Sequence, residues 1–107
     1  MLAAARLPAG DAWVLGYEVY LSVARAWLMA GQPDRARAVL APLLGAVERE
    51  PWVAALAAAL VLDSEALGRL GNRAQARQAL DRGTALAGDH GLLQVQREAR
   101  TAAGLVR

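Results

Sequence analysis

The stretch AGQPDRARAVL, residues 30–40, returns with changes as LGNRAQARQAL, residues 70–80. Four residues recur at a constant offset of 40: Gly31 and Gly71, Ala36 and Ala76, Arg37 and Arg77, Leu40 and Leu80. Repetition at a fixed period of this length is typical of proteins in which one supersecondary unit stacks on the next. The repeat therefore predicts two similar helical hairpins in tandem.

Apolar residues after each glycine turn follow the period of an amphipathic helix. In the first copy they are Ala36, Val39, Leu40, Leu43, Leu44 and Val47. Pro33 suits the first helical position, whereas Pro42 lies inside the pattern and is expected to kink the helix. In the second copy a helix is predicted over 73–87, with Asn72 as its N-cap.

A more apolar helix precedes each of these amphipathic ones, over about 11–30 and about 52–70. Gly71 is expected to end the second of them in a left-handed conformation. A helix that is apolar nearly all round packs on more than one side. The helix over 52–70 has more apolar surface than two hairpins are expected to cover, which predicts a neighbouring repeat or self-association through this helix.

These patterns predict an all-α protein of about five helices, built from tandem antiparallel hairpins. A flexible lead-in is expected over 1–10 and a repeat domain over 11–107. Within that domain we expect hairpins at about 11–48 and 51–87. A fifth helix, at about 92–103, would cap the stack or begin another repeat.

Composition limits the classes of function. The 107 residues carry a net charge of only +2, and they include no cysteine and no lysine. Thiolate metal sites and disulfides are therefore excluded. The longest apolar stretch, 51–62, is shorter than the ~20 residues of a membrane-spanning helix. We expect a cytoplasmic protein without a membrane segment, and the alanine and arginine usage favours a GC-rich bacterial source.

Residues capable of catalysis are few and lack partners in the sequence. His90 is the single histidine and lies in a turn between Gly88 and Gly91. Ser22, Ser64 and Thr84 have no local nucleophile motif around them. We therefore expect no enzymatic activity, no catalytic residues, no metal site and no cofactor.

The pattern Ala-x-x-x-Leu-x-x-x-Gly-x-x-x-x-Ala-x-x-x-Leu resembles a tetratricopeptide unit, although the period of 40 exceeds the usual length of about 34. A longer stretch, YEVYLSVARAWLMAGQPDRARAVLAPLL (17–44) with TALAGDHGLL (84–93), is similar to the superhelical sensor region of MalT-like, LuxR-type ATP-dependent transcriptional regulators. This resemblance implies a right-handed superhelix that senses a ligand or binds a protein.

Two features of those regulators do not occur in the sequence. There is no P-loop motif, and residues 91–107 are too few for a helix-turn-helix. Neither ATP hydrolysis nor DNA binding is assigned to these residues. Our first hypothesis is a non-enzymatic sensing or interaction segment of such a transcription regulator, with a small effector or a protein partner. The alternative is a stand-alone tetratricopeptide-like scaffold that binds proteins.

In tetratricopeptide-like arrays the first helix of each hairpin lines the concave groove. Carried over by resemblance, the groove-facing positions are Glu18, Ser22, Arg25 and Met29 in the first repeat, and Ala58, Leu62, Glu65 and Arg69 in the second. Arg25 and Glu65 have opposite charges at the repeat offset. They are expected either to form an ion pair across the repeats or to hold a polar ligand or peptide.

The remaining arginines and tryptophans have simpler interpretations. Arg35, Arg37, Arg73, Arg77 and Arg82 fall on the predicted outer helices, as do Asp34 and Asp81. This mixture is typical of a solvated face, and nucleic-acid binding is not expected. Trp13, Trp27 and Trp52 are expected to anchor the core, and Trp52 has an interface role as its alternative.

Overall fold

Helices form all of the regular structure in the computed structural model, which describes residues 11–45 and 52–106, with side chains over 17–45 and 52–104. They are α1 (Asp11–Met29), α2 (Pro33–Leu44), α3 (Val53–Arg69), α4 (Arg73–Asp89) and α5 (Leu93–Val106). The all-α prediction is confirmed. The predicted lead-in, 1–10, lies outside the described residues.

Each repeated glycine closes a helix by the same hydrogen bonds. Gly31 has φ of 74° and Gly71 has φ of 86°, both in the left-handed region where glycine has no steric penalty. The Gln32 amide donates to the carbonyl of Trp27 at 2.9 Å, and the Asn72 amide donates to that of Leu67 at the same distance. This pairing satisfies carbonyls that the helix end leaves free. The predicted left-handed turn at Gly71 is thus confirmed.

Helix ends depart from the sequence predictions in two places. α2 ends at Leu44, before the last apolar position expected of it, and Pro42 lies only two residues from this end. Proline lacks the N–H needed to continue the hydrogen-bond ladder, and Gly45 follows at once. Asn72 does occupy the N-cap of α4, but its side chain makes no capping hydrogen bond. The backbone carbonyl of Asn72 accepts from Ala76 instead.

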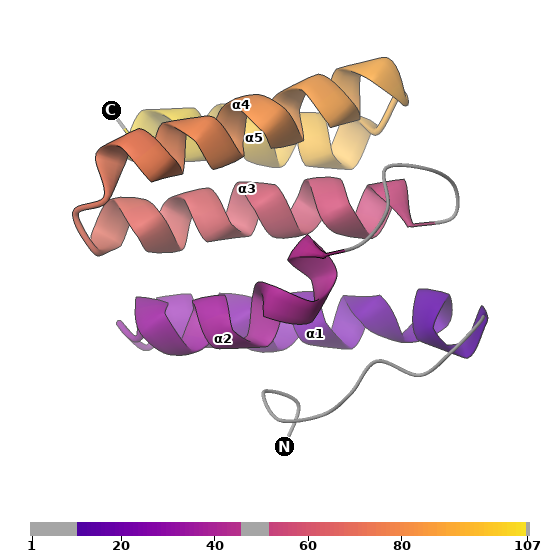
Figure 1. The fold of residues 1–107 in the computed structure, drawn as a ribbon, viewed down its shortest axis with the longest axis horizontal. Coiled ribbons are helices and arrows are strands. Elements are labelled where there is room, and N and C mark those ends of the chain that lie inside the picture. Colours follow the sequence, from indigo (N-terminus) through magenta and orange to yellow (C-terminus); the bar gives the residue numbers. More distant parts are fainter. Residues whose placement is uncertain (1–10, 46–51, 107) are drawn as a thin grey trace.

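The helices pack in the order expected of hairpins stacked along the chain. Each helix contacts its successor, and α3 also contacts α1 and α5. In Figure 1, α2 and α4 lie in front, and α1 and α5 lie farther away. α5 therefore occupies the place of a third first helix, beside α3. The right-handed twist implied by the resemblance stays a prediction.

α3 is the centre of the core. Thirteen of its 17 residues are buried, and Ala57 and Val61 have no exposed surface. α5, which belongs to neither predicted hairpin, covers the flank of α3 that two hairpins alone would have left open. Self-association through α3 stays a prediction. No helix in the described part of the chain is long and apolar enough to cross a bilayer.

Gly83 lies at a close approach between α3 and α4. A Cβ atom at this position would lie 3.1 Å from the Cβ of Leu60 and 3.2 Å from the backbone oxygen of Ala57. The backbone oxygen cannot move aside without shifting α3 as a whole. Glycine here therefore sets the spacing of the second hairpin, despite its poor helix propensity.

We predict that Gly83→Ala lowers the free energy of unfolding by about 1 kcal/mol, because overpacking outweighs the gain in helix propensity. Gly88 supplies the matched control, since a Cβ there meets nothing within 4 Å. Gly88→Ala should raise stability by about 0.5 kcal/mol. Urea unfolding of both variants checks this, and a Gly83→Ala protein as stable as the unchanged chain would contradict it.

An ion pair joins the first hairpin to α3. The Nε of Arg37 lies 2.7 Å from Oδ1 of Asp63, and Asp63 is only 4% exposed. Arg37 was expected on a solvated face, and this assignment is corrected. Its side chain is 40% exposed, so that the guanidinium reaches inward from the rim. A buried carboxylate needs such a partner to offset its lost hydration.

We predict that Arg37→Ala destabilises the fold by about 2 kcal/mol, because Asp63 stays buried without its partner. Arg77 is the repeat equivalent and is exposed. Arg77→Ala should therefore change the free energy of unfolding by less than about 0.5 kcal/mol. Chemical unfolding of both variants measures the difference. An equal loss of unfolding free energy in the two variants would show that the Arg37–Asp63 pair does not stabilise the fold more than an exposed arginine does.

Candidate binding groove

The three inner helices, α1, α3 and α5, together line an open groove with a volume of about 740 Å³. Apolar and charged side chains share its surface. The lining residues are Tyr17, Glu18, Leu21, Arg25, Leu28, Met29, Ala54, Ala58, Leu62, Glu65, Arg69, Leu92, Leu93, Gln94, Val95, Glu98 and Thr101. A concave surface of this mixed character is the kind of place where proteins bind ligands or peptide segments.

Most of the predicted groove positions do come together on this surface. They are Glu18, Arg25, Met29, Ala58, Leu62, Glu65 and Arg69. Ser22 is exposed but is not among the lining residues. Successive helical residues are turned by about 100°, and the groove-facing side of α1 runs through Tyr17, Leu21 and Leu28 instead. Whether these residues bind a ligand stays a prediction.

The contribution of α5 was missed by the sequence prediction, which treated this helix as a cap or the start of another unit. A signal for it was present. Ala58 lies 40 residues after Glu18, and the same step from Ala58 reaches Glu98. Both Glu98 and Gln94, which follows Ala54 by 40, line the groove. Extending the repeat register once more would have identified them.

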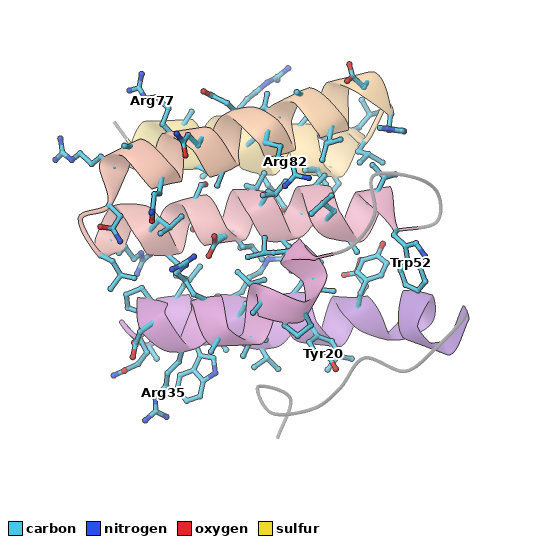
Figure 2. The ribbon with its side chains drawn as sticks, viewed as in Figure 1. Tyr20, Arg35, Trp52, Arg77 and Arg82 are labelled. Carbon is cyan, nitrogen blue, oxygen red and sulfur yellow. The ribbon has the colours of Figure 1, made fainter. Side chains whose placement is uncertain are left out.

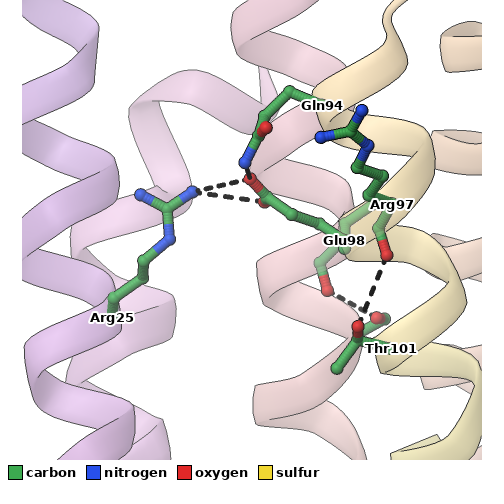
Figure 3. A network of polar contacts seen from close by, with 7 residues as sticks. Arg25, Gln94, Arg97, Glu98 and Thr101 are labelled. Carbon is green, nitrogen blue, oxygen red and sulfur yellow. Dashed lines mark hydrogen bonds and ion pairs between the residues drawn. The ribbon is translucent and has the colours of Figure 1, made fainter.

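Arg25 forms its ion pair with Glu98 and not with Glu65 as expected. Its Nη2 lies 3.2 Å from Oε2 of Glu98, which is 73 residues later in the chain. Figure 3 shows Arg25 reaching from α1 to Glu98 on α5, where Gln94 also donates to Oε1 at 3.2 Å. The pair thus bridges the two outer walls of the groove and fixes both partners at its rim.

Glu65 is half-buried in α3, and burial raises the pKa of its carboxyl above the ordinary value of 4.5. The positive charge of Arg69 opposes this rise in pKa, as does that of Arg25 more weakly, whereas the negative charge of Glu98 adds to it. Arg69 itself donates from Nη1 to the backbone oxygen of Leu28 at 2.7 Å. This oxygen lies at the C-terminal end of α1, where a positive charge is favoured.

Two apolar side chains of the groove project into solvent. Met29 is 89% exposed at the end of α1, and Leu93 is 67% exposed at the start of α5. Both line the groove. Exposed apolar side chains that gather at one concavity provide area that an incoming partner can bury.

The outer face has a different character. Arg35 packs over the ring of Trp27 at 4.9 Å. Figure 2 shows Arg77 of α4 pointing away from the ribbon. Trp27 and Trp52 are partly buried against the core, which confirms their role as anchors at its margin. The side chain of Trp13 lies outside the described residues.

The residues considered for catalysis or metal binding lie at separate places in the described part of the chain. There is no group of three or more histidine, cysteine, aspartate or glutamate residues placed to hold a metal ion there. His90 is exposed at the C-cap of α4. Ser64 is buried and donates its hydroxyl to the backbone oxygen of Val61, and Ser22 and Thr84 are exposed.

Comparison with protein families, with curated proteins and with solved structures finds no match for this chain. The groove is therefore interpreted from its own geometry and from the resemblance noted in the sequence.

The raised pKa of Glu65 gives a signed prediction for pH dependence. A carboxyl with a raised pKa in the folded state destabilises the fold while it is ionised. This penalty is present above the folded pKa and is lost as the pH falls to the unfolded value near 4.5. We predict that Glu65→Gln removes the penalty, so that the variant gains stability over the unchanged chain at neutral pH and loses this advantage toward pH 4.5.

Urea unfolding of both proteins at a series of pH values measures this difference. Asp81→Asn on the exposed face of α4 is the control, since it makes the same change of charge and group away from the groove. A Glu65→Gln difference that does not vary with pH would contradict the prediction.

Proposed function

We propose that this chain is a non-enzymatic binding module whose groove receives a segment of a protein partner. The observation that carries the proposal is the groove formed jointly by α1, α3 and α5. Small-molecule sites usually enclose most of their ligand, whereas this groove is open. An open trough with exposed apolar side chains at Met29 and Leu93 suits an extended segment better than a small effector.

The groove also offers a means of signalling. Its walls, α1 and α5, belong to different units of the stack, so an occupant that contacts both changes the relative stability of their packing on α3. A ligand shifts a conformational equilibrium only through such a difference in affinity between two states. This supports a sensing or interaction segment of a larger regulatory protein.

The resemblance of residues 17–44 and 84–93 to the sensor region of MalT-like, LuxR-type regulators is the support for transcription regulation in particular. The groove itself serves a stand-alone scaffold equally well. The parent reading frame separates the two: a P-loop domain upstream and a helix-turn-helix downstream would support the regulator, and a gene without either would favour the scaffold.

We predict that peptides selected on this chain from a random library bind through the exposed apolar groove residues. The Met29→Ser, Leu93→Ser double variant should bind them about tenfold more weakly, because two apolar contacts of roughly 0.7 kcal/mol each are lost. Isothermal titration calorimetry measures the affinities, and circular dichroism checks the fold.

The matched control is the Val19→Ser, Leu70→Ser double variant. These two residues are also large, apolar and exposed, but neither lines the groove. The control should bind within about twofold of the unchanged chain. If both double variants lose affinity for the peptides equally, or if neither loses affinity, the groove is refuted as the binding site.

A further inference from the structure

We propose that the groove selects segments carrying a lysine or arginine side chain, which pairs with Glu65 while its apolar neighbours cover the groove floor. This inference rests on the proposed function and names the chemistry of the partner. Five charged residues line the groove, and some of them are already held by contacts within the chain.

The groove is acidic although the chain as a whole is basic. Its lining includes three glutamates and two arginines, a sum of 2 − 3 = −1, whereas the whole chain carries +2. The charged lining residues are Glu18, Arg25, Glu65, Arg69 and Glu98. A difference of sign between one concave surface and the rest of the molecule favours a cationic partner at that surface.

Internal contacts already engage three of these five groups. Glu98 accepts hydrogen bonds from Arg25 and Gln94 on its two oxygens. Arg69 is directed to the backbone oxygen of Leu28. An anionic ligand would have to compete with these existing contacts for either arginine. The groove is therefore a poor binding site for a carboxylate or phosphate group.

Glu65 is the carboxylate that lacks such a contact. It has no hydrogen bond or ion pair with any of the side chains described, those of 17–45 and 52–104, although Arg69 lies one helical turn away on α3. Burial removes part of its hydration, and this is the main cause of its raised pKa. Glu18, the other carboxylate without a partner, is exposed and keeps its water. A basic side chain gains more from Glu65, because charge-assisted hydrogen bonds are stronger where water is partly excluded.

The surroundings of Glu65 include apolar groups for the rest of a basic side chain. Leu62 and Ala58 precede it on α3, and Leu21 and Leu28 of α1 line the same groove. All four are buried, so each offers only a small apolar area to the groove. Lysine and arginine carry long apolar stems that pack on such surfaces while the charged end reaches a polar group. Leu93 and Met29, both exposed, are available to apolar residues that flank the basic one.

The test uses the full 107-residue chain and a random library of short peptides blocked by acetylation and amidation, so that terminal charges do not contribute. Only peptides that lose binding to the Met29→Ser, Leu93→Ser variant are kept. We expect these groove-dependent peptides to be enriched in lysine or arginine. Replacing that residue by glutamine should weaken binding to the unchanged chain about tenfold, the value of one good charge-assisted contact.

Variants of the chain then locate the contact. Glu65→Gln should lower the affinity of the basic peptides about tenfold and leave the affinity of their glutamine versions unchanged. Glu18→Gln should lower the affinity of the basic peptides by less than about threefold. Glu18→Gln is the matched control because it alters the net charge of the same groove equally. In Glu65→Arg, peptides whose basic residue is changed to glutamate should regain affinity.

Each outcome decides something. Enrichment of basic residues together with the selective loss in Glu65→Gln supports the inference. Groove-dependent peptides that are acidic or uncharged, or that respond equally to Glu18→Gln and Glu65→Gln, overturn the inference and leave the proposed function standing. A library without any groove-dependent peptide overturns the proposed function, and the inference with it.

Discussion

Every other helix of the described structure packs against α3. Six of the 17 residues of α3 are alanine, and these small side chains let neighbouring helices approach its backbone at several positions. The approach is close at Gly83, where even a methyl group would meet the carbonyl of Ala57.

The packing of α1 and α5 on α3 determines the shape of the groove. Its floor is one face of α3, represented by Ala54, Ala58 and Leu62, and its walls are the helices that α3 holds on either side. Polar contacts then connect the walls: Arg25 reaches Glu98 across the groove. This pair is partly exposed, so it contributes little to stability. Its effect is to fix the positions of two charges and leave Glu65 between them without a contact.

Local patterns allowed most of the fold to be predicted. The left-handed turns at Gly31 and Gly71 depend on a few adjacent residues, and the helical periods around them depend on burial of one face. The end of α2 was placed too late, because competition between an apolar pattern and Pro42 is not decided by the pattern alone. The cover that α5 gives to α3 was also missed, since periodicity does not show which helices become neighbours.

The candidate site was predicted only in part, because a sequence pattern does not show which residues become neighbours in space. Repeat register placed Arg25, Glu65 and Arg69 on one surface, because hairpins at a constant offset repeat their facing positions. It did not identify the ion-pair partners. The partner of Arg25 comes 73 residues later in the chain, and Arg37 is held by Asp63, a residue with no acidic counterpart at the repeat offset. Such choices follow from three-dimensional proximity, which one repeat unit does not contain.

The small side chains of α3 also shape how this protein can change during evolution. An ordinary core tolerates losses and gains of volume to comparable degrees, because large residues can shrink and their neighbours can partly relax. Along α3 there is little volume left to lose at positions such as Ala57 and Ala59, and none of their surface is exposed. Neutral drift there is confined to the smallest residues. Exposed positions such as Met29 and Leu93 carry no such limit on volume, so substitutions are expected to alter the groove rim while the central helix stays nearly constant.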